Sequence, residues 1–487
     1  MAAIITEKFR VHNAKQFKED FDEPASSTYI FIGRSFDWTN ENSPPSPANS
    51  VGEEVDAYSD MVALKKVAPS DVSHGLVRRN WSTNTSYDEY QHDISSSNPG
   101  VASGATNLYD STFYVITDEY HVYKCIRTGR DSSGAVVNST VKPTGTSPTA
   151  LVETSDTGAA TGRGYLWKYM FSVSASDTIK FVTNDFIPVK TLGAQTEIDG
   201  ATGIGSAAAD DGSSQWDVEN QAVDGAVHHI VVTAGGSGYT DGDYTSVPIL
   251  GDGQNGVCTV HISGGAVTHV TVTTAGSGYK RASIDIQSIS GIGSGTNAAA
   301  KVIISPLIGH GADAITELGG NYIIVNSRLE FNEGGGDFPT DNDFRRIGLI
   351  QDPFNLGTTT VSQSSSLTSY NQLVASSVAN INVDDTIMSA QSNGASVAVS
   401  RVVSVDSENN IVKHIPIANS GGQYVDFVNS STIYVGGTNV ATIGASGIST
   451  VHPEIERYSG NVLYIENRGA VTRAADQIED IKLIIEM

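Results

Sequence analysis

Residues 163–173 read RGYLWKYMFSV, and this stretch decides the fold. Tyr165, Trp167, Tyr169 and Phe171 occupy every second position, so in an extended strand all four rings project from one face. Each buried ring removes roughly 150–250 Å² of surface from water. The stretch therefore predicts the core strand of a sheet-rich domain. A cofactor-binding stripe is the alternative interpretation, but large aromatic side chains at strand spacing are mostly buried in a core.

The composition favours a mainly β protein. The chain has 487 residues, of which 39% are hydrophobic, and its mean hydropathy of −0.15 is ordinary for a soluble globular protein. This length suits about two to four domains. Glycine is abundant at 49 residues and charged residues make up only 17%, a combination that favours turn-rich β structure over long surface helices.

The charge balance argues against a nucleic-acid partner. The 29 basic and 54 acidic residues give a net charge of −25, which repels nucleic acid and anionic lipid at long range. The doublets Lys65-Lys66, Arg78-Arg79 and Arg345-Arg346 could form local anion sites, but such doublets usually belong to a solvated face or to salt bridges. We assign them no ligand.

The number of cysteines and the lengths of the hydrophobic runs indicate in which compartment the protein folds. Only Cys125 and Cys258 occur, too few for a disulfide framework, which suits a reducing cytoplasm. The opening residues, MAAIITEKFRVH, contain too short an apolar run for a signal peptide. No run of about 18 apolar residues occurs, as a membrane-spanning helix would need. We expect a soluble protein that leaves a cell by lysis or through dedicated machinery.

The core elements follow from local patterns. A capping box at Asn13 and Gln16 predicts a short helix to about Asp22, and a second box at Ser50 and Glu53 predicts another helix after a proline-rich loop. Strand patterns occur at 28–33, 77–81, 112–126, 181–192, 322–331, 345–350, 460–468 and 478–485. Residues 131–162 have the composition of a loop.

Two insertions interrupt this pattern. After Gly193 the chain is dominated by Gly, Ala, Ser and Asp through Ser214, as expected of a linker into an inserted unit. We predict a core formed by 1–195 together with 305–359 and 455–487, one inserted β module at 196–304 and a second at 360–454.

The insertions share a repeat of a strand, a tight glycine turn and a tyrosine. The turns lie at Gly236, Gly238 and Tyr239, at Gly276, Gly278 and Tyr279, and in a diverged copy at Gly421 and Tyr424. Glycine adopts positive φ angles at no steric cost, which suits such turns. A strand of small residues follows each copy, at 256–262, 295–304 and 437–443.

Signatures of catalysis are scarce. The common motifs for phosphate binding, zinc proteases, serine hydrolases and CxxC redox chemistry do not occur. Residues 235–238 followed by Asp241 and Asp243 suggest a calcium nonapeptide, but Thr240 occupies the place where that motif needs a carboxylate. Paired carboxylates for glycoside cleavage stay open, because their spacing is spatial rather than sequential.

Histidine recurs once in each copy of the repeat. His229, His269 and His414 occupy equivalent positions beside β-branched residues. Packing or a structural hydrogen bond explains this recurrence better than a metal ion does. We assign no catalytic residue, no metal and no cofactor.

Short motifs in a common order resemble one known family. They are Gly33-Arg34-Ser35 with Trp38, Pro44, Pro45 and Pro47, Arg78-Arg79-Asn80-Trp81, Val122-Tyr123-Lys124-Cys125, the aromatic strand from Gly164, Asn184 with Phe186-Ile187, Phe338-Pro339 with Phe344-Arg345, Ser459-Gly460, Tyr464-Ile465-Glu466-Asn467-Arg468, and Ala475-Asp476-Gln477 with Glu479 and Ile481. Together they resemble the gene 8 baseplate wedge family of T4-like contractile-tailed bacteriophages. The resemblance covers roughly 1–195, 305–355 and 455–487 and breaks down at both insertions. Gly469-Ala470 also departs from the family, which tends to have prolines there.

This resemblance implies a structural role. It implies a mostly β, non-enzymatic virion protein that forms a homodimer, is assembled in the host cytoplasm and docks onto other baseplate wedge proteins in the viral tail, with no nucleic acid or membrane partner. The alternative is a tail-associated carbohydrate-binding adhesin or polysaccharide-degrading enzyme, because exposed tyrosines on glycine-rich repeats could stack on sugar rings.

The candidate structural and interface residues are mostly aromatic. They are Trp38, Trp81, Tyr165, Trp167, Tyr169, Phe171, Tyr464, Glu466, Asn467 and Arg468, together with the glycines and tyrosines of the repeat turns. We expect Arg468 to belong either to an interface or to a buried ion pair, with a solvated position as the alternative.

Overall fold

The computed structural model shows a mainly β protein and describes residues 4–193, 211–330, 342–449, 453–472 and 477–487. Strands account for 41% and helices for 11%, so the predicted fold class, mainly β with small α content, is confirmed. Phe338, Pro339, Ala475 and Asp476, as well as most of the predicted linker, lie outside the described residues.

The chain divides into two compact units. The first consists of residues 1–15, 73–324 and 484–487, and the second of 16–72 and 325–483. Residues of the predicted core therefore contribute to both units. The boundaries of the two insertions stay predictions.

The aromatic stretch lies in a four-stranded antiparallel sheet of the first unit. The sheet has the order β4 (Tyr114–Ile116), β5 (His121–Arg127), β7 (Leu166–Ser172) and β6 (Val152–Glu153). Trp167 and Tyr169 are buried in one hydrophobic cluster with Tyr165. The predicted core strand is therefore present.

A β-bulge changes the predicted facing of one ring. Tyr123 pairs with Tyr169, but the next residue of β5, Val122, pairs with Phe171, so β7 carries one extra residue at Met170. Phe171 accordingly packs with Val122 and Met170 in a different cluster from Tyr169. The prediction that all four rings share one face is wrong for Phe171, because a bulge resets the two-residue period.

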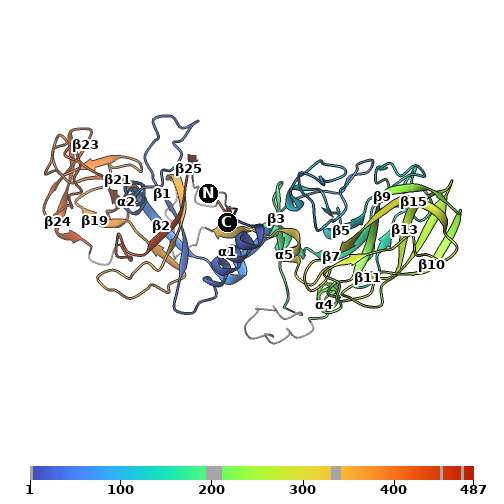
Figure 1. Ribbon diagram of the computed structural model, residues 1–487. Helices are drawn as coiled ribbons and strands as arrows, with labels where there is room; N and C mark the ends of the chain where they lie inside the picture. Colours follow the sequence, from blue (N-terminus) through green and yellow to red (C-terminus); the bar gives the residue numbers. More distant parts are fainter. Residues whose placement is uncertain (1–3, 194–210, 331–341, 450–452, 473–476) are drawn as a thin grey trace. The chain divides into compact units, whose positions relative to one another are not determined.

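A second sheet of the first unit contains the first two repeat copies. Its order is β10 (Gly242–Pro248), β12 (Val257–Ser263), β13 (Ala266–Thr274), β9 (Val227–Tyr239) and β15 (Gly293–Ile304). The short strands β11 (Leu250–Gly251) and β14 (Ala282–Ser283) pair beside it. Figure 1 shows β9, β13 and β15 running side by side as long ribbons. This sheet encloses its own cluster of mainly Val and Ile.

The remaining elements of the first unit complete its core. β3 (Val72–Val77) pairs with β8 (Phe186–Val189). The helices within the first unit are α3 (Ala175–Phe181), α4 (Ser214–Asn220) and α5 (Ala314–Leu318), with a 3₁₀ turn at Leu108–Asp110. Three further elements contain residues of both units: α1 (Glu7–Glu19), β16 (Tyr322–Leu329) and β26 (Glu479–Glu486). Val11 of α1 and Leu318 of α5 pack in the cluster that holds Phe171.

The second unit contains a five-stranded antiparallel sheet. Its order is β18 (Ser366–Thr368), β2 (Met61–Lys66), β1 (Thr28–Gly33), β17 (Asp343–Gln351) and β25 (Asn461–Thr472). All six residues of β1 are buried, which fits a central strand that reads as a continuous apolar run. β25 is an edge strand of this sheet. A 3₁₀ turn lies at Pro69–Asp71.

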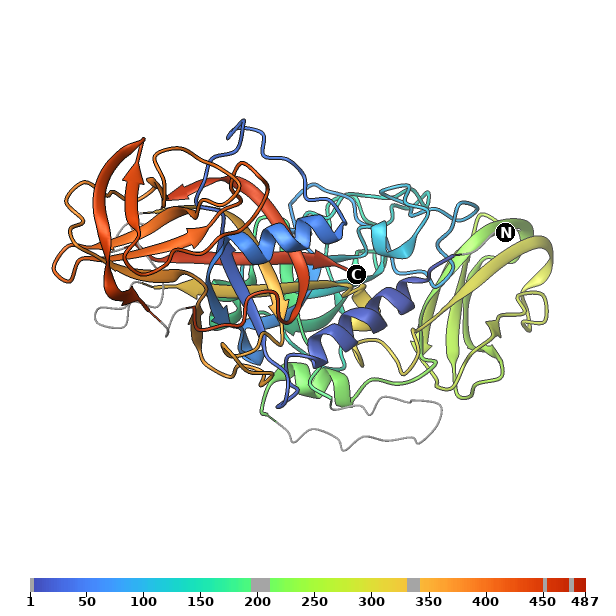
Figure 2. The same ribbon diagram turned by 90° about the vertical axis from the view of Figure 1, so that its left-hand side faces the viewer.

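A small closed barrel completes the second unit. Its strands, in barrel order, are β19 (Asn371–Ala375), β22 (Ile411–Pro416), β21 (Val399–Asp406), β20 (Thr386–Met388), β23 (Thr432–Val435) and β24 (Thr438–Ile448). Figure 2 shows the barrel strands beside helix α2 (Val51–Asp60), which contacts β22. Its interior is apolar.

The helix predictions have mixed outcomes. The Ser50 cap is confirmed, because its hydroxyl accepts a hydrogen bond from the backbone N–H of Glu53 at the start of α2. Helix α1 begins at Glu7 rather than at Asn13, so the Asn13 capping box is wrong. The strand predicted at 77–81 ends at Val77, and residues 175–181 ahead of β8 form α3, capped by Ser174.

Candidate interaction sites

Two adjacent arginines of β17 hold the polar side of the second unit together. Arg345 is ion-paired with Glu41 at 2.8 Å, Asp37 at 2.7 Å and Asp343 at 3.1 Å. Arg346 is ion-paired with Glu53 at 2.6 Å and Asp60 at 3.2 Å, and its Nε donates to Asn467 at 2.9 Å. We call these two arginines and their carboxylate partners the arginine clamp.

The two arginines of the clamp are buried, whereas Asp37 and Glu41 lie at the surface. The side chains of Arg345 and Arg346 are only 4% and 2% exposed. Of the two interpretations of this doublet, solvated face or salt bridges, the structure therefore has salt bridges. Because Glu53 and Asp60 belong to α2, Arg346 connects that helix to the sheet. Removal of one partner would leave a buried charge without a counter-charge.

The Gly33-Arg34-Ser35 motif forms a close crossing beside the clamp. A Cβ atom on Gly33 would lie 2.7 Å from the carbonyl oxygen of Asp60, so only glycine fits there. Arg34 has a φ of 58°. Its guanidinium lies 3.5 Å from the ring centroid of Trp38, a cation–π contact.

Several sequence-predicted residues meet at the edge strand β25. The indole N–H of Trp38 donates to the carbonyl oxygen of Arg468 at 2.9 Å, and the Asn467 amide donates to the carbonyl of Pro45 at 3.2 Å. The Tyr464 hydroxyl donates to Glu466 at 3.1 Å. Burial, and then the neighbouring carboxylate of Glu466, raise the pKa of Tyr464 to about 12.

Arg468 itself is exposed. Among the described residues its side chain makes no ion pair, so the buried ion pair considered for it is not present. The interface and solvated interpretations stay open. Leu463, on the same strand, is 42% exposed.

The aromatic residues of the first unit form a packed core rather than a surface. Tyr165 and Trp167 stack with ring centroids 5.6 Å apart, and Tyr87 meets Trp167 edge to face at 5.7 Å. The Tyr165 hydroxyl donates to the carbonyl of Val137 at 2.8 Å, and Trp81, partly buried against this cluster, donates from its indole to Ser139 at 3.2 Å. The rings of Tyr165 and Trp167 are therefore not available to a partner, whereas Trp81 keeps part of its surface exposed.

Two lysines lie on the other face of β5 and β7. Lys124 and Lys168 are cross-strand partners and both are buried. The Lys124 ammonium lies 2.5 Å from Glu317 and 2.9 Å from the Nδ1 atom of His310. Burial lowers the pKa of each lysine to about 8, with Glu317 acting in the opposite direction. Burial alone would raise the pKa of Glu317, but Lys124 and His310 outweigh it and lower this pKa to about 2.

This lysine group is closed to solvent. The Lys124 side chain is 0% exposed, so no substrate can reach its amine. The sequence analysis did not find these residues, because the alternating pattern draws attention only to the aromatic face. The signal that could have found them is the presence of Lys124 and Lys168 within otherwise apolar strands.

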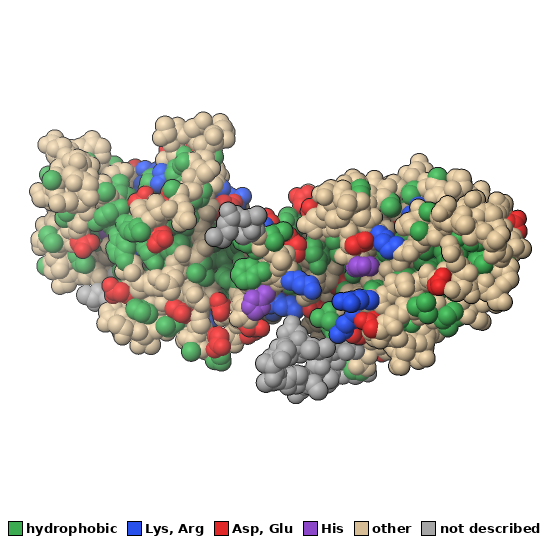
Figure 3. Space-filling view, viewed as in Figure 1, with side chains coloured by type: hydrophobic (Ala, Val, Ile, Leu, Met, Phe, Trp, Pro, Cys, Tyr) green, Lys and Arg blue, Asp and Glu red, His purple; other side chains and the backbone are tan. Residues whose placement is uncertain are grey.

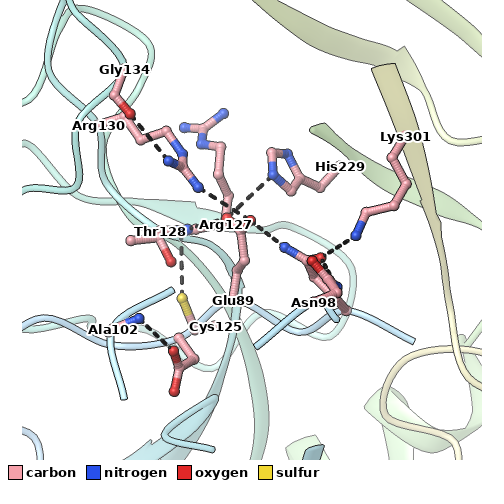
Figure 4. A network of polar contacts seen from close by, with 12 residues as sticks. Glu89, Asn98, Ala102, Cys125, Arg127, Thr128, Arg130, Gly134, His229 and Lys301 are labelled. Atoms are coloured by element: carbon pink, nitrogen blue, oxygen red, sulfur yellow. Dashed lines mark hydrogen bonds and ion pairs between the residues drawn. The ribbon is translucent and has the colours of Figure 1, made fainter. Parts of the chain in front are cut away.

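A second buried network surrounds Glu89. Its carboxylate accepts from the Gln91 amide at 2.8 Å and the Thr128 backbone N–H at 3.1 Å, and it pairs with Arg130 at 3.4 Å and His229 at 3.3 Å. Figure 4 shows Arg130 and His229 approaching Glu89 from different elements. Burial would raise the pKa of Glu89, but His229 and Arg130 outweigh it and lower this pKa to about 2. The Nε2 atom of His229 thus lies beside the Glu89 carboxylate, and this contact joins β9 to the rest of the first unit.

The repeat tyrosines of the first two copies are buried. Tyr239 and Tyr279 are 5% and 2% exposed. Gly236, Gly238, Gly276 and Gly278 all have φ angles between 64° and 81°. The third copy differs: Gly421 has no positive φ, Gly422 has a φ of 71°, and Tyr424 is 43% exposed. The sugar-stacking alternative requires exposed tyrosines, and Tyr239 and Tyr279 are not exposed.

The other recurring histidines are also in packed positions. His269 stacks on His261 with ring centroids 4.0 Å apart, and His414 meets Phe427 edge to face. In the described part of the chain no group of three or more His, Cys, Asp and Glu residues could hold a metal ion. Cys125 and Cys258 are buried free thiols. No described helix is long and apolar enough to cross a bilayer.

Comparison with known proteins relates the chain to a phage tail component. Residues 3–199 match the family model described as Bacteriophage T4, Gp8. The "Baseplate wedge protein gp8" of Enterobacteria phage T4 is 27% identical over 210 residues, covering 38% of this chain and 60% of that relative. The chain thus spans about 60% of the length of the curated relative that it matches. The resemblance predicted from the sequence is confirmed for this region and stays a prediction for 305–355 and 455–487.

Proposed function

We propose that the chain, whose residues 3–199 match the family model described as Bacteriophage T4, Gp8, is a structural subunit of a contractile phage tail baseplate wedge. The match to a baseplate wedge protein is the observation that carries this proposal. The buried, ion-paired arginines of the clamp and the buried aromatic cluster support a scaffold role, since their groups are used in packing and in internal ion pairs. Assembly in the host cytoplasm is part of the proposal.

The location of the chain in the particle tests this proposal. Intact virions that contain the protein are labelled with an antibody against it and imaged by electron microscopy. We expect label at the end of the tail, at the baseplate. Label on the capsid, label only on tail fibres, or absence of the chain from purified particles would contradict the proposal.

We further propose that the protein forms a homodimer and contacts other wedge proteins. β25 is a 12-residue edge strand on which Leu463 and Arg468 are exposed; Trp38 and Glu41 cover its edge at Arg468 and Ala470, and the rest of the edge is a template for pairing with another chain. The occupant proposed for this edge is a second copy.

Light scattering should give twice the 51.3 kDa of one chain. Leu463→Asp should yield monomers, whereas Val428→Asp, at an exposed site away from β25, should not; a dimeric Leu463→Asp variant would move the interface elsewhere.

An absence of catalysis belongs to the same proposal. No observation favours the adhesin or hydrolase alternative, since the repeat tyrosines Tyr239 and Tyr279 are packed inside. Incubation with host envelope polysaccharide should release no reducing ends. Turnover that a single carboxylate substitution abolishes would overturn this part.

A further inference from the structure

A cavity of the first unit is lined by arginines. It has a volume of about 430 Å³ and lies between β9 and β13 on one side and the segments 127–134 and 162–163 on the other. Its lining includes Arg127, Arg130 and Arg163 but no Asp or Glu. We call it the basic cavity. Three converging arginines are unexpected in a chain whose net charge is −25.

Two of the three arginines are neutralised. Arg127 pairs with Glu153 at 2.8 Å, and Arg130 pairs with Glu89 at 3.4 Å. Each still has unused donors within the described part of the chain, since Arg127 uses only its Nε and Nη2 atoms and Arg130 only its Nη1 and Nη2 atoms. Both guanidinium groups can therefore donate further hydrogen bonds.

Arg163 is the unmatched charge. It is only 8% exposed, and among the described residues its guanidinium has no hydrogen bond and no ion pair, although it lines the cavity. Burial, together with the positive charges of Arg130 and Arg127, lowers the pKa of Arg163, and Asp131 offsets this only in part. A guanidinium that lines a cavity without a protein partner is free to form strong charge-assisted hydrogen bonds with an oxyanion.

We propose that the basic cavity binds a small organic oxyanion, a carboxylate or a phosphate, with Arg163 as its principal ligand and Arg127 and Arg130 as additional donors. The volume of about 430 Å³ lies in the range of small-molecule sites and exceeds what a bare inorganic ion needs. The hydroxyl groups of Ser132 and Thr233 also line the cavity and suit a ligand that carries its own hydroxyls. This inference does not rest on the baseplate assignment.

Binding to the full chain tests the proposal. Calorimetric titrations at constant ionic strength use glucuronate, glucose 6-phosphate and inorganic phosphate, with glucose as the neutral control. We expect at least one of the organic anions to bind and glucose not to bind. Which anion binds best identifies the chemical source; equal binding of glucose, or no binding of any anion at millimolar concentration, would overturn the proposal.

Variants locate the site. Arg163→Met should weaken binding of the best anion by about tenfold or more, and Arg163→Lys should weaken it less, because it retains the charge but not the fork of donors. Arg281→Met removes an exposed arginine of the same unit outside the cavity and should leave the affinity unchanged.

The folding of the variant is checked separately. Without ligand, Arg163→Met should melt no lower than the parent protein, because it removes an unpaired buried charge. A melting temperature that rises with added anion in the parent but not in Arg163→Met supports the proposal. Equal anion affinity in Arg163→Met and the parent would overturn it.

Discussion

Trp167 is the largest fully buried side chain of the protein. It fills the space between Tyr165 and Tyr87, and its neighbours are themselves fixed by hydrogen bonds to backbone groups. Its indole nitrogen has no hydrogen-bond partner among the described residues. The contribution of Trp167 to stability is therefore packing, and it depends on shape rather than on a polar contact.

We expect Trp167→Ala to lower the free energy of unfolding by roughly 3–5 kcal/mol, because it leaves a large cavity in a rigid aromatic cluster. Trp167→Phe should cost less, since no hydrogen bond of the indole is lost. Denaturation in urea measures both. Val101→Ala, at a side chain that is 41% exposed, is the control and should change little. A Trp167→Ala protein with unchanged stability would refute the burial of this ring.

Glu89 gives a prediction that depends on pH. Its pKa in the folded protein is about 2, below the value of 4.5 for a free glutamate. The carboxylate therefore favours the folded state at pH values above about 4.5, and this contribution is lost as the pH falls through about 2. Glu89→Gln should cost about 2–3 kcal/mol at pH 7, and the difference from the parent should shrink below pH 4.5.

Urea denaturation at several pH values checks this prediction. Asp93→Asn is the matched control, because Asp93 pairs with Lys301 in a contact that is 41% exposed on the carboxylate side and should contribute less than about 1 kcal/mol. A Glu89→Gln penalty that stays constant from pH 7 to pH 3 would show that the ionic contacts of Glu89 are not its source.

Residue types alone could predict which side chains are buried, but not toward which face of the sheet each one points. The alternation at Tyr165, Trp167 and Tyr169 gives their common cluster correctly. The position of Phe171 was not predicted correctly, because the bulge at Met170 depends on how β5 and β7 pair. No residue type in the strand indicates that bulge. Lys124 was not predicted for another reason: its partners Glu317 and His310 lie far away in the sequence.

At the scale of elements, the repeat is explained by a tyrosine lying on a glycine. A Cβ atom on Gly295 would lie 2.3 Å from the Tyr239 ring, and one on Gly253 would lie 2.4 Å from the Tyr279 ring. The Tyr279 hydroxyl also accepts from the Gly256 N–H at 3.1 Å and donates to the carbonyl of Ile249 at 2.9 Å. Each tyrosine thus locks a glycine turn onto a neighbouring segment.

Gly295→Ala should therefore destabilise the first unit by about 2 kcal/mol or more, because the added methyl group collides with the Tyr239 ring. The cost should fall in a Tyr239→Leu background, where the ring is absent, and a double-mutant cycle of unfolding free energies measures that coupling. Gly52→Ala is the control and should not destabilise, because Gly52 is helical and the added Cβ would lie 3.8 Å from the Ser50 hydroxyl oxygen. Equal costs of Gly295→Ala in both backgrounds would contradict the ring collision.

The sequence could predict that the repeat exists but not how each copy uses it. Spacing alone equates Tyr424 with Tyr239, yet Tyr424 is exposed because its segment belongs to a closed barrel rather than to the five-stranded sheet. The positive φ in the third copy lies at Gly422, one residue beyond the predicted Gly421. Spacing does not specify the partner strand on which a turn packs.

At the scale of the whole molecule, low charge on the surface and ion pairs inside go together. Figure 3 shows that charged side chains cover little of the visible surface of the part formed by β9–β15. The arginines of the clamp, in contrast, are buried, and Arg346 is buried together with the carboxylate of Asp60. The composition predicted the mainly β class correctly. It could not predict that the proposed core contributes to two compact units, because that division depends on long-range pairing such as β1 with β17.

The ends of the first inserted sheet lie close together. Ile230 pairs with Val302 and His229 pairs with Ile303, so the chain enters on β9 and leaves on β15 as cross-strand neighbours. Helix α4, although it lies inside the predicted insertion, contacts β7, and its Val218 is buried in the aromatic cluster. We propose that only the part beyond His229 and before Ile303 is peripheral.

Replacing residues 231–301 by a short Gly/Ser linker should therefore leave a soluble protein that melts cooperatively. Loop-closure entropy grows only with the logarithm of length, so joining two cross-strand neighbours should change the stability of the remaining core by about 1–2 kcal/mol. The contact of His229 with Glu89 is retained in this variant, as is α4. A matched variant that removes 215–301 also deletes Val218 and Glu219, whose carboxylate accepts from the Leu192 N–H at 2.9 Å, and should lose its cooperative transition. Calorimetry distinguishes the two variants. Aggregation of both would show that the five-stranded sheet is integral to the core. Cooperative melting of both would show that α4 is not integral to the core.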